Sequence, residues 1–312
     1  MQEFIGQSPF HAGEIEAQLR AGVQLRGAPI RDFMPDQHRA FFAMLPFVVI
    51  ATNDAAGWPV ASTLAGPQGF IASPDPQHLV IDAGPDAIDP IAPLLVPHAP
   101  FALLGIDLAT RRRNRANGRV VARDEQGLQL EVLQSFGNCP QYIQGRQAYY
   151  VPPAETSALE RLPQLDEEAL AQIRNADTFF VATSTATRSG PAFGADISHR
   201  GGRPGFVRID DGNLLTIPDF RGNRYFNTLG NLLLEPRAGL LFIDFDRGDL
   251  LHVQGTTEIL WDGPELDRIE GAERVWRVRV ERVWRRRDAV PLRWVFREFS
   301  PVTLATGEWL PS

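Results

Sequence analysis

Short apolar stretches rich in Val, Ile, Leu and Phe recur along this chain and alternate with turn-forming sequences such as DAAG, SPDP and DDGN. Stretches of this kind, punctuated by Gly, Pro and Asp, are typical of strands joined by tight turns. Helical patterns occur at residues 12–26, in PDQHRAFFAML from Pro35 onwards, and in LDEEALAQIRNA, where Asp166 is the expected N-cap. Strands at such close spacing predict a meandering sheet that closes into a small barrel.

The same pattern occurs twice along the chain. LPFVVIATNDAAGWPVAS at 45–62 overlays DTFFVATSTATRSGPAFG at 177–194, and LLGID at 103–107 falls on LLFID at 240–244. Self-similarity of this extent indicates one β-rich unit used twice. We therefore predict a mainly β (α+β) fold of two tandem barrels, each preceded by a helix.

A segment with prolines and polar residues, VPPAETSALERLPQL at 151–165, separates the two copies and is typical of a surface linker. We place the domain boundary there, with a degenerate N-terminal barrel and its leading helices at 1–150 and a C-terminal barrel at 151–312. Near the end of the second copy, VWRVRVERVW alternates as a strand does and puts Arg282 in phase with the apolar side. A bulge, an ion pair or a ligand contact would account for that arginine.

Composition excludes several kinds of chemistry. All 31 basic residues are arginine, which rules out a Schiff-base lysine and a P-loop lysine. Cys139 is the only cysteine, and the six histidines are scattered, so we predict no internal disulfide and no metal site. Cys139 itself is either a reactive thiol at a helix start or a packed residue at the seam between the halves.

The net charge of -7 disfavours nucleic acid as a partner. RRRNR at 111–115 is the only dense basic run, which we interpret as a solvated hairpin, with a polyanion patch as the alternative. No apolar run approaches the length needed to span a membrane, and the first residues lack the pattern of a secretory signal. We therefore expect a cytoplasmic protein without a membrane partner.

The two copies differ in charge. Arg203, Arg208 and Arg224 of the second copy stand where the first copy has no basic residue. Arginine that the shared fold does not require is available for a ligand. The alternative is that these arginines pair with the nearby carboxylates of Asp210, Asp211 and Asp219 at the surface.

GNRYFNTLGNLL, which begins at Gly222, carries further features of an anion site. Asn223 is expected to cap a helix whose first turn contains Arg224, while Gly222 permits close approach of the backbone. Free backbone N–H groups, the helix dipole and a guanidinium group together favour a phosphate. The segment therefore predicts a phosphate-binding site.

These motifs resemble those of the pyridoxamine 5'-phosphate oxidase-like, FMN-binding split-barrel family. The family pattern of an arginine, four residues, a basic residue, a strand and Gly-Ser/Asn-Arg is met by Arg203, Arg208 and the run from Gly222 to Arg224. SFGNCPQYI at 135–143 is similar to a segment that follows the barrel in one branch of that family. The resemblance covers roughly residues 35–295 and implies two split barrels, the second of which binds FMN.

The resemblance also implies roles for individual residues. Arg203, Arg208 and Arg224 would hold the FMN phosphate, with Asn223 in place of a family serine beside Gly222. Pro218 and Asp219 would lie beside the flavin, and Trp284 and Arg293 would reach its isoalloxazine side. Gln141, Tyr142 and Gln144 of the first half could reach a flavin edge. The family's Arg-x-His signature reads Arg293, Trp294, Val295 here, so vitamin B6 oxidation is not predicted.

The sequence therefore favours an FMN-binding flavoprotein, a flavin-dependent oxidoreductase that acts on an unidentified small molecule or receives electrons from a donor. Two alternatives stay open, a non-catalytic flavin-binding or carrier module and a structural or interaction protein without a cofactor. FAD or a deazaflavin could replace FMN. Proteins of this family form the cofactor pocket at a dimer interface, which the two halves could imitate within one chain, or two chains could pair as a homodimer.

Overall fold

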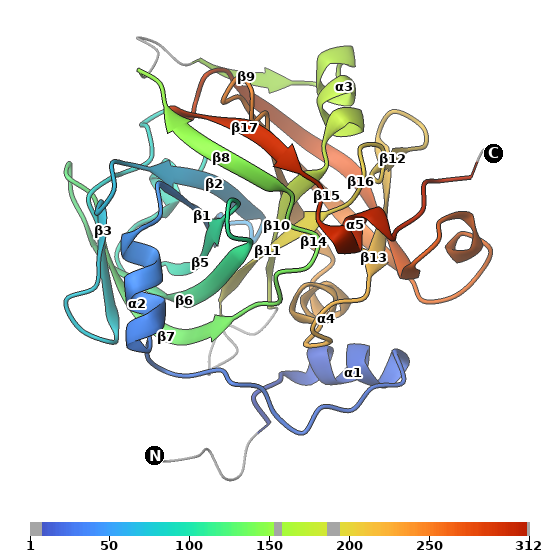
Figure 1. Cartoon of the computed structure of the whole chain (residues 1–312), viewed down its shortest axis with the longest axis horizontal. Helices are drawn as coiled ribbons and strands as arrows, with labels where there is room; N and C mark the ends of the chain where they lie inside the picture. The colour runs from blue at the N-terminus through green and yellow to red at the C-terminus, as the bar shows by residue number, and fades with distance from the viewer. Residues whose placement is uncertain (1–7, 153–157, 186–193, 311–312) are drawn as a thin grey trace.

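The computed structural model describes residues 8–152, 158–185 and 194–310. The first half forms a seven-stranded antiparallel sheet in the order β2-β1-β5-β6-β7-β4-β3 (Figure 1). Its strands are β1(Phe47–Asn53), β2(Pro59–Ala65), β3(Ile71–Ala72), β4(His78–Ile81), β5(Pro100–Asp107), β6(Arg112–Arg123) and β7(Leu128–Gly137).

The second half repeats this arrangement strand by strand, in the order β11-β10-β14-β15-β16-β13-β12. Its strands are β10(Thr178–Ser184), β11(Ala195–Gly201), β12(Arg208–Ile209), β13(Leu214–Phe220), β14(Arg237–Ile243), β15(Leu250–Leu260) and β16(Ala272–Arg286). The added strand β9(Leu159–Leu162) pairs with β16. Two tandem split barrels in a mainly β chain are thereby confirmed.

Strand pairing corrects the sequence overlay of the first strands by one residue. Val49 pairs with Leu104, and Phe180 pairs with Leu241. Since the overlay of LLGID on LLFID places Leu104 on Leu241, Val49 corresponds to Phe180 and not to Val181. A slip of one residue moves every side chain of a strand to the other face, so only the pairing shows which side chains point between the barrels.

Three groups of buried apolar side chains hold the molecule together. One fills the first barrel and a second fills the other. The third lies between the barrels, where Val49 and Leu104 of the first half pack with Phe180, Ile197 and Leu241 of the second. The two barrels therefore share a continuous core along the faces of β1, β5, β10, β11 and β14.

Few helices accompany the sheets. They are α1(Ala12–Arg20), α2(Asp36–Ala43), α3(Glu167–Asn175), α4(Asn227–Leu234), α5(Pro301–Leu304) and the 3-10 turns η1(Ala92–Leu94) and η2(Leu266–Arg268). Asp166 caps α3 as predicted, because its carboxylate accepts from the N–H of Ala169 at 2.8 Å. The helix predicted at 12–26 is shorter, since the chain reverses at Gly22, which has a φ of 65°.

The first helix lies against the second barrel, where α1 crosses α4 (Figure 1). The crossing is close because Gly13 and Gly230 face each other: a Cβ atom added to Gly230 would lie 2.7 Å from the Cα atom of Glu14. In the described part of the chain, no helix is long and apolar enough to cross a membrane.

Two strands at the boundary between the halves were not expected. β9 lies within the predicted linker, and β8(Gly145–Tyr150) pairs with the C-terminal β17(Leu292–Glu298). The division of domains at residue 150 remains a prediction. In β16 a bulge lies opposite Gln254 and Gly255, after which Arg282 is exposed, 3.4 Å from the Asp54 carboxylate. The bulge and the ion pair together account for that arginine.

Candidate anion-binding site between the two barrels

A cavity opens between the two barrels and has a volume of about 840 Å³ when the space open to solvent is included. The first barrel contributes residues of β6 and of the segment after β7. The second contributes β11, β13, the loop before α4, the start of α4 and β16. Both halves of the chain are therefore needed to form it.

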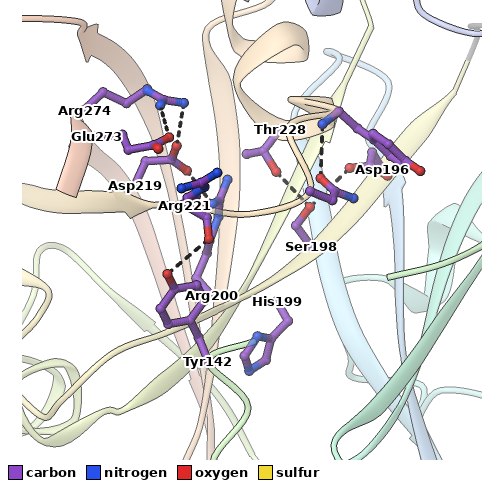
Figure 2. A network of polar contacts seen from close by, with 12 residues as sticks. Tyr142, Asp196, Ser198, His199, Arg200, Asp219, Arg221, Thr228, Glu273 and Arg274 are labelled. Atoms are coloured by element: carbon purple, nitrogen blue, oxygen red, sulfur yellow. Dashed lines mark hydrogen bonds and ion pairs between the residues drawn. The ribbon is translucent and has the colours of Figure 1, made fainter. Parts of the chain in front are cut away.

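Arginine dominates the second barrel's side of the cavity. Arg200 Nη1 lies 2.5 Å from Asp219 Oδ1, and Arg274 Nη1 lies 3.1 Å from Asp219 Oδ2 (Figure 2). Arg274 also contacts Glu273 at 2.6 Å, and Arg224 approaches the same carboxylate at 3.7 Å. Three guanidinium groups thus share two carboxylates, which leaves one excess positive charge on this side.

Arg115 reaches into the cavity from β6 of the first barrel and is almost fully buried. It donates to Asp196 Oδ1 at 2.6 Å and to Ser198 Oγ at 2.5 Å. Thr228, at the start of α4, donates to the same Ser198 hydroxyl at 2.8 Å. Figure 2 shows Asp196, Ser198 and Thr228 together on the side of the view opposite Asp219. This network ties β6, β11 and α4 together across the seam.

Arg113, two residues before Arg115 on the same strand, is held by two neutral acceptors. Its Nε donates to the carbonyl of Cys139 at 2.8 Å, and Nη1 donates to Nδ1 of His199 at 3.0 Å. Burial and neighbouring arginines hold the pKa of His199 well below its usual range, so the ring is neutral. Burial, followed by repulsion from Arg115 and Arg200, lowers the pKa of Arg113 to about 9.

Glu14 of α1 lies behind the cavity and is 5 % exposed. Its carboxylate accepts from the N–H of His11 at 2.9 Å and from the side-chain amide of Asn227, a residue that lines the cavity. Burial raises the pKa of Glu14 to about 7, and its hydrogen bonds only partly oppose that rise. The charge behind the cavity therefore changes near neutral pH.

An aromatic pair forms another part of the wall. The rings of Tyr142 and Phe220 are stacked, with centroids 5.4 Å apart. The Tyr142 hydroxyl donates to the carbonyl of Arg221 at 3.1 Å. Burial raises the pKa of Tyr142 to about 12, so it keeps its proton at neutral pH. This part of the cavity offers a flat apolar surface.

The loop before α4 differs from the sequence prediction. The helix begins at Asn227, so Arg224 does not lie in its first turn, and Asn223 accepts from the N–H of Tyr225 at 3.1 Å without capping the helix. Arg224 and Phe226 both have a φ of 62°, and these left-handed residues delay the helix. Phe226, in the cap position, provides no side-chain acceptor for α4.

Five of the nine predicted site residues line the cavity: Pro218, Asp219, Gly222, Asn223 and Arg224. Four do not. Arg203 donates to the carbonyl of Leu304 at 2.6 Å.

Arg208 pairs with Asp210 at 2.6 Å and Glu265 at 2.7 Å, and stacks on Trp309 at 4.3 Å. Its pairing with Asp210 agrees with the alternative given above, in which these arginines form ion pairs with nearby carboxylates.

The two predicted residues near the C-terminus also lie away from the cavity. Trp284 of β16 pairs with His252 of the neighbouring strand β15 and with Arg161 of β9. Arg293 donates to the carbonyl of Val290 at 2.8 Å and to the Asp288 carboxylate.

Residues of the first half reach the cavity as the sequence suggested, since Gln141 and Tyr142 line it. Gln144 lies outside the lining, buried, with its amide 3.0 Å from the Thr303 hydroxyl. Cys139 is half-buried at the seam.

The sequence did not point to four arginines of the cavity, Arg113, Arg115, Arg200 and Arg274. The run RRRNR was interpreted as a solvated hairpin, which holds for Arg112 but not for the residues on either side of Asn114. Alternation along a strand was the available signal, because it places residues two apart on the same face.

Within the described residues, the first barrel has no such cavity at the position that corresponds to Ser198, because side chains fill the space. Ser62 and Ser198 correspond, since they pair with equivalent positions of β1 and β10. Around Ser62 the space holds Arg286, whose guanidinium pairs with Asp89 and lies 3.2 Å from Asp86. Ser62 donates to Asp89 at 2.5 Å, and Arg286 and Asp89 are buried. An internal ion pair therefore takes the place that the cavity has near Ser198.

Comparison with known proteins gives a family match for the second barrel. The sequence model of the family described as pyridoxamine 5'-phosphate oxidase matches residues 165–288. Comparison with curated proteins gave no match.

Three solved structures are similar to part of the chain. HupZ of Group A Streptococcus is 20% identical with a TM-score of 0.30, covering 38% of this chain and 90% of its own. A candidate pyridoxamine 5'-phosphate oxidase of Lactobacillus delbrueckii is 17% identical with a TM-score of 0.30, covering 39% and 94%. HutZ, a heme storage protein of Vibrio cholerae, is 14% identical with a TM-score of 0.27, covering 38% and 91%.

Proposed function

We propose that the cavity between the two barrels binds FMN, because residues 165–288 match the sequence model of the pyridoxamine 5'-phosphate oxidase family. The observation that carries this proposal is the charge on the second barrel's side of the wall, where three guanidinium groups share the two carboxylates of Asp219 and Glu273. Guanidinium groups gathered in a partly buried space favour a bound anion. The two barrels of one chain would then form the type of pocket that we expected at a dimer interface.

The phosphate of FMN would be held on the second barrel's side. Arg200, Arg224 and the first turn of α4 line the same cavity. The start of α4 carries no side-chain cap, so its backbone N–H groups and the positive end of its dipole are available to an anion. Asn223 and Gly222 complete the loop that would pass around the phosphate.

The stacked rings of Tyr142 and Phe220 would contact the flat isoalloxazine system. When bound, FMN would supply the hydride or electron transfer of a flavin-dependent oxidoreductase acting on a small molecule. The residues of this chain would position the reactants, with Tyr142 protonated and His199 neutral at physiological pH.

The absorbance spectrum of the purified protein tests the proposal. We expect flavin bands and the release of FMN on denaturation. Arg224→Met and Arg200→Met should each raise the FMN dissociation constant at least about tenfold, because a hydrogen bond to a charged group contributes about 1.5–3 kcal/mol. Arg203→Met is the matched control, since Arg203 donates to Leu304 outside the cavity, and should have a smaller effect.

A colourless protein that takes up no FMN would overturn the proposal. Release of FAD, a deazaflavin or a heme would replace FMN by another anionic cofactor. Reduction of the bound flavin by NADH, NADPH or another donor, followed by turnover, separates an oxidoreductase from a non-catalytic carrier.

A further inference from the structure

Arg113 differs from the other arginines of the cavity, because within residues 8–152, 158–185 and 194–310 no carboxylate pairs with it. The two groups that accept its hydrogen bonds, the Cys139 carbonyl and Nδ1 of His199, are both neutral. The guanidinium group is thus fixed in position while its charge is not balanced.

Holding a charge in this way is costly. Burial and two neighbouring arginines lower the pKa of Arg113, yet the value of about 9 leaves the group protonated at neutral pH. Arg113 is half-buried, and a partly desolvated cation without a counter-ion reduces stability unless a ligand or partner balances it. Perturbed groups that line a cleft are therefore concentrated at binding sites.

The fold itself does not require a cation at this position. Arg113 in β6 and Leu250 in β15 occupy equivalent positions. Leu103 and Leu240, the first leucines of LLGID and LLFID, correspond, and each pairs with a residue of the next strand. Arg113 lies three residues before the partner of Leu103, and Leu250 lies three residues before the partner of Leu240. Leu250 is fully buried and packs in the core between the barrels. At the equivalent position of the second barrel, the fold is therefore stable with an apolar side chain.

The excess positive charge of the cavity lies at two places. On the second barrel's side, three guanidinium groups share Asp219 and Glu273, and one charge is left over. On the first barrel's side, Arg115 is balanced by Asp196, and the charge of Arg113 is left over. A phosphate monoester is close to a dianion at neutral pH, so its charge could match both places, but one held on the α4 side would leave the Arg113 guanidinium without an anion in contact with it.

We propose that Arg113 binds a carboxylate or phosphate group of a second ligand, which enters the cavity beside the cofactor. This inference rests on the proposed function, since the second ligand would be the substrate or electron donor of the flavin. A guanidinium group presents paired N–H donors that match the oxygens of a carboxylate or phosphate. His199 and the Cys139 carbonyl act as positioning groups that orient this donor pair.

Isothermal titration calorimetry with inorganic phosphate as the probe tests the inference. Phosphate is titrated into the protein with FMN bound and into the protein without FMN. We expect the FMN-loaded wild type to bind one phosphate, and Arg113→Met to weaken that binding at least about tenfold while FMN affinity changes by less than about threefold. Arg112→Met is the matched control, because Arg112 is exposed and lies on the ring of Phe41.

Equal phosphate affinity in the wild type and Arg113→Met would overturn the inference. Loss of FMN from Arg113→Met, together with complete exclusion of phosphate by FMN, would also overturn it and would assign Arg113 to the cofactor phosphate. If the wild type takes up no FMN, the proposed function fails, and phosphate binding to the FMN-free protein still decides the role of Arg113. Arg113→Gln, which removes the charge and retains a donor for the Cys139 carbonyl, serves if the methionine variant does not fold.

Discussion

The carboxyl group of Glu14 should make the stability of this protein fall as the pH rises towards neutrality. Its pKa is raised by burial from 4.5 to about 7. An acid whose pKa is higher in the folded state binds its proton more tightly there, so folding is favoured at low pH. Stability is lost between about pH 4.5 and pH 7 and changes no further above pH 7. The shift corresponds to about 3 kcal/mol, at about 1.4 kcal/mol for each pH unit.

Glu14→Gln isolates this contribution, because glutamine has the shape of the protonated acid and does not ionise. The variant can still accept one of the two hydrogen bonds from His11 N–H and the Asn227 amide, and loss of the other should cost about 1 kcal/mol at low pH. Between pH 4.5 and pH 8.5 the variant should gain about 3 kcal/mol relative to the wild type.

Urea unfolding of both proteins at pH 4.5 and pH 8.5 measures this difference. Glu16→Gln is the matched control, since Glu16 lies on the same helix, is exposed and pairs with Arg20 at 2.7 Å. It should change the free energy of unfolding by less than about 0.5 kcal/mol at either pH. A difference between Glu14→Gln and the wild type that is the same at both pH values would refute the reasoning.

Three further substitutions test the packing of the molecule, two by the free energy of unfolding in urea and one by limited proteolysis. Arg286→Leu should destabilise the protein by about 3–5 kcal/mol, because it leaves the buried carboxylate of Asp89 without its cation; a loss below about 1 kcal/mol would contradict this. Gly230→Ala should detach α1 from α4, since the new Cβ would lie 2.7 Å from the backbone of Glu14, and proteolysis within α1 would reveal it. Asp166→Ala should cost at least about 1 kcal/mol, because it removes both the α3 cap and the ion pair with Arg285, and an unchanged midpoint would contradict this.

The general architecture followed from the sequence because it depends on local patterns. Alternating apolar stretches with turn residues between them specify antiparallel strands, and the internal repeat indicates that the same sheet is built twice. Asp166 as a helix cap could likewise be predicted, since a cap depends on residues three apart. The loop from Gly222 to Arg224 was predicted as part of an anion site from its chemistry and lies at the cavity, although the left-handed backbone at Arg224 and Phe226 was not predicted.

The composition of the cavity was decided by tertiary structure. Arg203 and Arg208 belong to the same motif as Arg224, yet packing of the C-terminal segment and pairing with carboxylates place them elsewhere. Arg113 comes from the other barrel, 87 residues before Arg200, and its position in the cavity follows from how the barrels pack. The sequence by itself determined which strands form and that they form twice. Burial, and therefore which charges remain unbalanced, is a property of the assembled barrels, because it depends on contacts between residues far apart in the chain.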